Sequence, residues 1–127
     1  MTPNEKTAAV ASKLIRLTRE GALTWKKTLG SNELPEDSNH RVTACYETTF
    51  QGRRLALYAE RVRGEFARDV DDVIEWWNPS VGLAVLDNKG SLEWRFPSIP
   101  GLDDLLEAVR YRTGNIDGLL DELMKTG

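Results

Sequence analysis

The sequence is poor in the residues from which catalytic and metal centres are most often built. Its 127 residues include one histidine and one cysteine. A single cysteine cannot form an internal disulfide, and zinc sites usually draw on several His or Cys ligands. Neither the P-loop pattern Gly-x-x-x-x-Gly-Lys-Ser/Thr nor the dinucleotide pattern Gly-x-Gly-x-x-Gly occurs. We therefore expect no catalytic residues, no metal and no cofactor.

Long apolar stretches are also missing. No run approaches 18 consecutive apolar residues, and Met1 to Lys6 has no apolar segment behind a basic end. Five prolines, 40% hydrophobic residues and 29% charged residues are typical of an ordinary folded protein. We predict a single domain over residues 1–127 that is soluble and cytoplasmic and does not associate with a membrane.

The net charge of −3 hides an asymmetry between the two halves of the chain. Residues 1–64 hold eleven Lys and Arg against seven Asp and Glu, a balance of +4, whereas residues 65–127 hold six against thirteen, a balance of −7. Such a chain could pair head-to-tail with a copy of itself or present one charged face to a partner. Charge dispersed over a solvated surface is the alternative explanation.

Residues 4–20 are predicted to form an amphipathic helix. Asn4 is a good N-cap and Gly21 a typical stop. Leu23 and Trp25 then alternate with polar residues, which predicts a short extended piece. The apolar face of the helix repeats at helical spacing and consists of Val10, Ala11, Leu14, Ile15, Leu17 and Thr18.

After a polar segment at 30–40, which is typical of a loop, a period of two predicts a β-hairpin with Gln51-Gly52 as its turn. With that turn, Phe50 faces Arg53, and every following pair is fixed. One face should enter the core and holds Tyr46, Leu55, Leu57 and Ala59. The other should be exposed or partly covered and holds Glu47, Arg54, Ala56 and Tyr58.

A second hairpin is predicted from Val81 to Phe96, with the segment Asp87 to Gly90 as a type I turn followed by a glycine. A helix beginning at Leu102 should end near Gly114, and Asn115 could cap another. Their leucines fail as a coiled coil because Gly114 and Gly118 interrupt them, so both helices are expected to cover the sheet. Leu120, Leu123 and Met124 could still form an apolar edge that a second copy covers.

The segment "VIEWWNP" (residues 73–79) places two tryptophans side by side. As a helix beginning near Asp69, it puts Val70, Val73, Ile74 and Trp77 on one face, and the residue before Pro79 would end it. We predict a short helix between the hairpins, with Trp77 in the core. Trp76, about 100° away, then either lids the core or contacts a partner.

The fold class is accordingly α+β: an N-terminal helix, a four-stranded antiparallel sheet from two hairpins with a short helix between them, and one or two C-terminal helices packing on the sheet. Spaced residues along most of the chain resemble small bacterial and phage proteins without an established function. The resemblance supports a single domain and assigns no site. It is carried by Leu14, Thr18, Gly21, Leu23, Trp25, Phe50, Gly52, Asp87 to Gly90, Leu102, Asp104, Leu105, Val109, Arg110, Asp117, Leu120 and Leu123.

Two weak candidates for chemistry remain. His40 and Cys45 are five residues apart, roughly 16 Å in a strand, so we expect an exposed loop histidine and a packed cysteine rather than a catalytic pair. The acidic cluster at 68–72 lacks the glycine and the distant glutamate of a calcium loop. Acidic residues at the start of a helix explain it better.

The leading hypothesis is a non-enzymatic protein–protein interaction module, as a homodimer or as an inhibitor or regulator of a bacterial protein. Its candidate contacts are Trp76, Tyr58, Arg54, Leu120 and Met124. The alternative is binding of nucleic acid or a small ligand by the basic first hairpin, where tyrosines could stack bases. An overall pI near 5.2 argues against nucleic acid. The basic residues are Arg41, Arg53, Arg54, Arg61 and Arg63.

Overall fold

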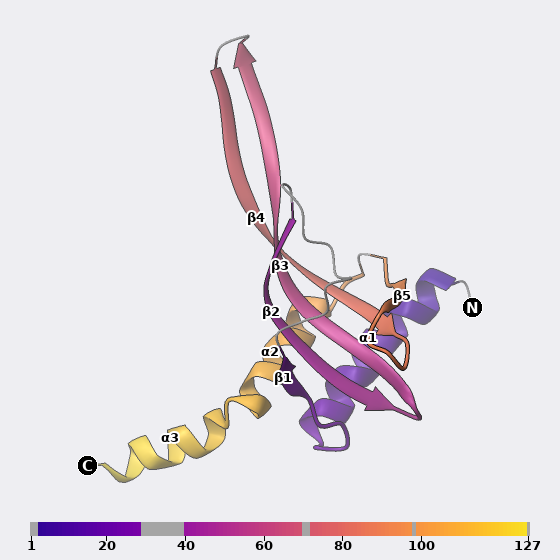
Figure 1. Cartoon of the computed structure of the whole chain (residues 1–127). Coiled ribbons are helices and arrows are strands. Elements are labelled where there is room, and N and C mark those ends of the chain that lie inside the picture. The colour runs from indigo at the N-terminus through magenta and orange to yellow at the C-terminus, as the bar shows by residue number, and fades with distance from the viewer. Residues whose placement is uncertain (1–2, 29–39, 70–71, 98, 127) are drawn as a thin grey trace.

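The computed structural model describes residues 3–28, 40–69, 72–97 and 99–126, with only the backbone at 3–4, 65–69 and 72–75. The α+β class is confirmed: an N-terminal helix, an antiparallel sheet and C-terminal helices follow one another along the chain (Figure 1). The sheet has five strands in the order β1-β2-β3-β4-β5 rather than four. The added strand is β1 (Lys26–Thr28), the short extended piece that follows the first helix.

The first helix, α1 (Pro3–Arg19), confirms the helix predicted over 4–20. It ends at Gly21, whose φ of +77° suits a residue without Cβ. Thr18 connects the end of α1 to the segment that follows it. Its hydroxyl donates to the Leu14 carbonyl at 2.7 Å and accepts from the Trp25 indole N–H at 2.9 Å. Buried Trp25 thereby locks β1 to the helix.

The predicted stripe of α1 is split between two environments. Ala11, Leu14 and Thr18 are buried, but Val10 is 37% exposed. Leu17 is only partly buried against the core. The apolar face of α1 is therefore wider than the surface that covers it.

The first hairpin has the predicted register from Phe50↔Arg53 to Ala44↔Ala59, and an irregularity between Ala44 and Val42 shifts the pairs beyond it by one residue. Strand β2 (His40–Phe50) pairs with β3 (Arg53–Asp69) around Gln51-Gly52. Phe50 faces Arg53, as the two-residue turn requires. His40, expected in a loop, begins β2, and the remainder of the predicted loop lies outside the described residues.

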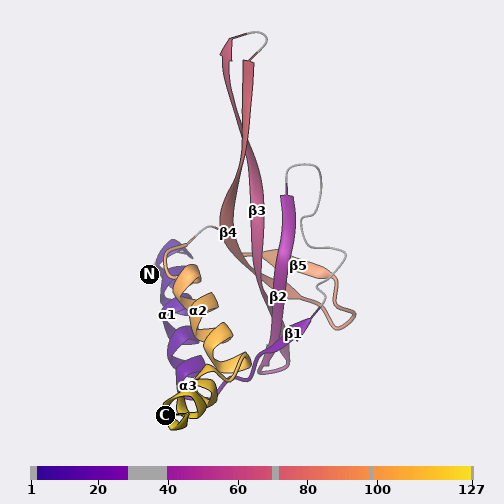
Figure 2. The ribbon, with the colours of Figure 1, turned by 90° about the vertical axis from the view of Figure 1, so that its left-hand side faces the viewer.

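The core lies between the sheet and two helices, α1 and α2 (Leu102–Thr113), which cover the same face (Figure 2). All four residues predicted for the core face of the hairpin belong to it. The buried cluster consists of Ala11, Leu14, Leu23, Trp25, Tyr46, Leu55, Leu57, Ala59, Leu83, Leu102, Leu105, Leu106 and Val109.

The opposite face of the sheet is not the wet surface that the alternation predicts. Ala56 and Tyr58 are fully buried there, in a second cluster with Cys45, Ala84 and Leu86. Only Glu47 and Arg54 remain half-buried, as expected for a partly covered face.

Tyr58 is buried because the sheet itself makes room for its ring. Gly82 lies directly opposite in the register, and a Cβ at Gly82 would fall 2.2 Å from Tyr58 Cζ. The Arg95 guanidinium covers the ring at 5.8 Å from its centroid. Because Gly82 has no side chain and Arg95 covers the ring, Tyr58 is fully buried.

The predicted helix between the hairpins is wrong. Strand β4 (Asp72–Leu86) pairs with β3 in one ladder that runs from Arg54↔Leu86 to Asp69↔Asp72. Beyond Val62, the last partner of β2, this pair continues as a two-stranded arm that projects from the body (Figure 1). Among the described residues no third strand pairs with the arm, and backbone pairing with β3 rather than helical spacing places residues 72–77. Trp77, predicted in the core, is 38% exposed.

The second hairpin is confirmed. It links β4 to β5 (Leu92–Arg95) through the turn predicted at Asp87 to Gly90. Asp87 Oδ1 accepts from the backbone N–H groups of Lys89 and Ser91, both at 2.9 Å. Gly90 has a φ of +87°, which explains the glycine at this position.

The last helix departs from the prediction. Helix α2 covers the sheet, but α3 (Ile116–Lys125) has no buried residue and runs away from the body (Figure 1). Asn115 precedes α3 in the left-handed conformation, at φ 49°, without the side-chain capping bond expected of it. The bend at Gly114 and Asn115 directs α3 away from the sheet.

The close packing of the Tyr58 ring against Gly82 leads to a prediction for a substitution at Gly82. Gly82→Ala should lower the free energy of unfolding by about 1–3 kcal/mol, because the new methyl group meets a ring with no room to move. Urea denaturation monitored by tryptophan fluorescence measures the change.

Gly64→Ala is the matched control. Its Cβ would lie 2.6 Å from Trp76 Cε2, but this indole is 40% exposed and can rotate into solvent. We expect it to cost less than about 1 kcal/mol. Equal losses in the two variants would show that Tyr58 is not rigidly held.

Candidate functional site

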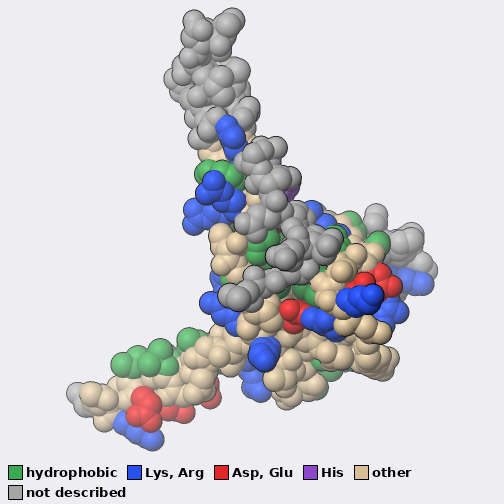
Figure 3. All heavy atoms as spheres, viewed as in Figure 1, with side chains coloured by type: hydrophobic (Ala, Val, Ile, Leu, Met, Phe, Trp, Pro, Cys, Tyr) green, Lys and Arg blue, Asp and Glu red, His purple; other side chains and the backbone are tan. Residues whose placement is uncertain are grey.

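Helix α3 carries four exposed apolar side chains. Leu119, Leu120, Leu123 and Met124 follow helical spacing, and their exposed fractions rise from 48% at Leu120 to 84% at Met124. Figure 3 shows the hydrophobic side chains gathered on one side of this helix and the acidic ones on another. The helical repeat places Asp117 and Asp121 on one flank of the stripe and Glu122 on the other.

A second apolar surface is a groove of about 330 Å³ between α1 and the end of the sheet where the hairpin turns lie. One wall of the groove is the side of α1 that carries Val10 and Leu17, which the core does not fully cover. Two cations, Lys13 and Arg53, stand among otherwise apolar walls. The apolar lining consists of Val10, Leu14, Leu17, Phe50, Leu55, Val85 and Phe96.

The two tryptophans of "VIEWWNP" lie at the base of the arm on opposite faces of β4, since adjacent strand residues alternate. The Trp76 indole covers Gly64, its partner across the ladder. The Arg41 guanidinium lies 5.1 Å from the centroid of Trp77. Both rings keep about two-fifths of their surface exposed. The pair therefore has two different environments but similar access to solvent.

Two other predicted contacts lie in less accessible places. Tyr58 is fully buried. Arg54 Nη2 donates to Glu47 Oε1 at 2.6 Å, and both side chains are partly buried. Neither is presented to a partner as Trp76, Leu120 and Met124 are.

The basic residues of the first hairpin are dispersed rather than gathered into one patch. Arg54 is paired with Glu47, and Arg53 Nη2 lies 3.8 Å from Glu93. Arg41 stacks on Trp77. Arg61 lines a different hollow, of about 540 Å³, beside acidic and basic residues of α2. Arg63, further along β3, is partly buried.

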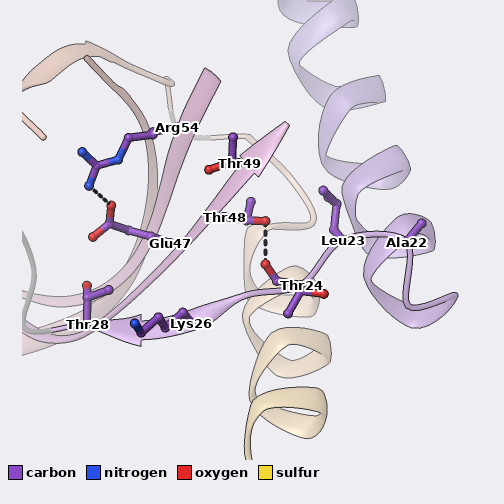
Figure 4. A pocket seen from close by; sticks show the side chains of 9 residues that line it. All are labelled: Ala22, Leu23, Thr24, Lys26, Thr28, Glu47, Thr48, Thr49 and Arg54. Atoms are coloured by element: carbon purple, nitrogen blue, oxygen red, sulfur yellow. Dashed lines mark hydrogen bonds and ion pairs between the residues drawn. The ribbon is translucent and has the colours of Figure 1, made fainter. Parts of the chain in front are cut away.

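A hollow of about 630 Å³ lies between the segment 22–28 and the first hairpin (Figure 4). Two polar contacts are made within its lining: the Thr48 hydroxyl donates to the Thr24 carbonyl at 2.8 Å, and Arg54 binds Glu47. A nucleophile held by a base would be needed for acyl or phosphoryl transfer, and the residues lining this hollow do not provide that pair.

Cys45 is packed inside the second cluster, with 2% of its surface exposed. Burial raises the pKa of its thiol and the negative charge of Glu47 adds to this, while a hydrogen bond from Thr28 acts in the opposite direction. The neutral thiol is a poor nucleophile. His40 lies five residues away on the same extended strand, which keeps the two side chains apart.

Metal ligands do not converge within the described residues, where no group of three or more His, Cys, Asp or Glu is placed to hold an ion. The acidic cluster at 68–72 belongs to strand backbone at Asp69 and Asp72, not to the start of a helix. Its side chains lie outside the described part. None of the described helices is long and apolar enough to cross a membrane.

One buried polar cluster was not expected from the sequence. The Glu60 side chain is 1% exposed and accepts from Arg95 Nη2 at 2.9 Å. Tyr58 Oη and Glu60 Oε2 are buried without a hydrogen-bond partner among the described residues. The available signal was the alternation Ala56, Tyr58, Glu60, which places an acid beside two residues of the second cluster.

Comparison with protein-family models, curated proteins and solved structures finds no match to this chain.

The buried Tyr58 hydroxyl gives a prediction for alkaline pH. Burial raises the pKa of Tyr58 to about 12, against the opposing charge of Arg95. The unfolded chain releases this proton near pH 10, so the stabilising contribution is complete below pH 10 and is lost as pH rises towards 12. Between pH 8 and 11, wild type should lose about 1 kcal/mol more than Tyr58→Phe.

Urea denaturation of both proteins at the two pH values tests this, because titration of all other groups is common to them. At pH 8, Tyr58→Phe should be at least as stable as wild type, since the hydroxyl has no partner in the described structure. Parallel losses of stability at alkaline pH would mean that Tyr58 titrates normally.

Proposed function

We propose that the protein is a non-enzymatic interaction module and that α3 is the helix with which it binds a protein partner. The observation that carries the proposal is the apolar face of α3, none of which is buried in the described structure. Burying one such side chain contributes about 1.5–3 kcal/mol, so four of them are a substantial source of binding energy.

The length of α3 supports a bound role. Isolated helices shorter than about 12–15 residues are marginal in water, and α3 has ten residues including Gly118. Ile116, Leu120 and Leu123 recur at the i, i+4, i+7 spacing by which amphipathic helices enter grooves. A partner surface would supply the tertiary contacts that ordinarily stabilise such a helix.

The distribution of aromatic residues adds to this proposal. Trp76 at the base of the arm remains accessible and is of the residue type most often found among energetic anchors. The buried thiol, whose pKa is raised, and the hollow beside the first hairpin give catalysis little support by comparison.

The proposal is tested by replacing the apolar face of α3 without lowering its helix propensity. Leu120→Gln/Leu123→Gln keeps residues of similar propensity but makes the face polar. We expect the free energy of unfolding to stay within about 0.5 kcal/mol of wild type, because these side chains make no buried contact, while association is lost. Thermal unfolding, sedimentation velocity and co-purification from the native cells measure the two effects.

Lys125→Gln is the control, since it changes the polar side of the same helix, away from the stripe and its acidic flanks, and should keep association. Two results contradict the proposal. One is unchanged association of the leucine variant. The other is a loss of more than about 2 kcal/mol in stability, which would mean that α3 packs on its own body.

Nucleic-acid binding is a second candidate with one favourable observation: exposed Arg41 lies over the half-exposed indole of Trp77, and its ladder partner Arg61 is also exposed. The tyrosines first expected to stack bases are buried, so Trp76 and Trp77 would have to replace them. A salt-dependent mobility shift with random oligonucleotides, abolished in Arg41→Glu/Arg61→Glu, is the expected sign of this function. Unchanged mobility at low salt removes it.

A further inference from the structure

We infer that the partner of α3 is a second copy of this chain, whose apolar groove between α1 and the sheet receives the helix while its own α3 enters the groove of the first copy. This inference rests on the function proposed above. In this arrangement the exposed apolar stripe of α3, which is convex, packs into the apolar groove, which is concave.

The groove has the character of a binding surface. Val10 and Phe50 on its two walls are 37% and 38% exposed, although both are large apolar residues. Its volume of about 330 Å³ would hold roughly two side chains, since a cavity of about 150 Å³ accepts a benzene ring. Two leucines of α3 match this capacity.

The charges of the two surfaces are complementary. Lys13 stands on the helical wall of the groove and Arg53 on the sheet wall, and both are exposed. Arg53 Nη2 lies 3.8 Å from Glu93 Oε2, and such an exposed ion pair is weak enough to be replaced by a contact with α3. Acidic residues flank the apolar stripe of α3 on both sides, with Asp117 on one and Glu122 on the other. A helix lying in the groove would bring each acidic flank towards a cation, which favours this pairing and fixes its register.

Pairing of α3 with α3 of another copy is disfavoured by the same charges. Such a contact would bring the acidic flanks of two helices together, with Lys125 as the only cation of each. Like charges brought together across an interface oppose association.

The α3 of the same molecule cannot fill the groove. Helix α2 lies against the side of α1 that carries Ala11 and Ile15, close to Gly101. The groove uses a different side of α1, with Val10 and Leu17. Helix α3 leaves from the end of α2 and runs away from the body (Figures 1 and 2). An α3 that fills the groove therefore comes from another molecule.

Reciprocal exchange doubles the interface. Two leucines of α3 in each of two grooves place four leucines, with the groove walls around them, in one closed contact. Specific complexes start near about 1,200 Å², a size that two contacts approach more closely than one. A closed two-fold dimer also leaves no free helix or groove, whereas one-way docking would continue as a filament.

Cross-linking of two differently tagged copies tests the geometry. One copy carries Val10→Cys in the groove and the other Met124→Cys at the edge of the α3 stripe, leaving its leucines unchanged. With a short bis-maleimide, the mixture should give a hetero-tagged dimer. Wild type should not react, because Cys45 is buried. Cross-linking confined to two Met124→Cys copies would overturn the inference in favour of α3 pairing with α3.

Reversing the charges of the groove and of α3 tests whether these charges direct the pairing. Lys13→Glu/Arg53→Glu should raise the dissociation constant of the dimer about tenfold or more in sedimentation equilibrium. Mixing that protein with Asp117→Lys/Glu122→Lys should restore a heterodimer, since opposite charges again face each other. Failure of the mixture to associate, with both variants folded, would overturn the assignment of the groove.

The two proposals fail in different ways. A protein that stays monomeric at all concentrations, yet binds another protein through Leu120 and Leu123, overturns the second copy as partner and leaves the interaction function intact. A protein whose association is insensitive to Leu120→Gln/Leu123→Gln overturns the interaction function of α3, and with it the dimer described here.

Discussion

The register of β3 is the constraint on which the remaining structure depends. This strand pairs with β2 on one side and β4 on the other, and its residues alternate between two buried clusters. Leu57 faces the helices and Tyr58 the opposite side, so a slip of one residue would exchange them and disrupt both clusters. The Gln51-Gly52 turn, with φ values of 50° and 79°, fixes the register on one side. Gly82, which admits the Tyr58 ring, fixes it on the other.

Sequence periodicity predicted the elements that have one side in the core: α1, the first hairpin, the second hairpin and α2. It failed beyond Val62, where β3 and β4 pair with each other and no third strand joins them among the described residues. The apolar residues of 69–77 then matched a helix by spacing alone, although long-range backbone pairing decided the structure. The burial of Tyr58 was hidden for a related reason, because it depends on a glycine 24 positions away in the chain.

The candidate surfaces show a similar division. The sequence indicated an apolar stripe at Leu120, Leu123 and Met124, and helical spacing is sufficient for that inference. It did not indicate what covers the stripe, because amphipathicity describes a helix and not its surroundings. The left-handed Asn115 decides the direction of α3, and its conformation is a property of the folded chain. The groove could not be foreseen either, since α1 and the two hairpin turns meet only in three dimensions.

The uneven charge of the chain acquires a structural meaning from this arrangement. The first half, with a balance of +4, contributes Lys13 and Arg53 to the groove, and the second half, with −7, contributes Asp117 and Glu122 to α3. Within one molecule α3 points away from the body, so its acidic charge is not neutralised by the basic half (Figure 3). In the dimer that we propose, the same charges attract between two molecules and bring the apolar stripe to the groove. Because α3 has no buried residue in the monomer, its apolar face is available for that contact.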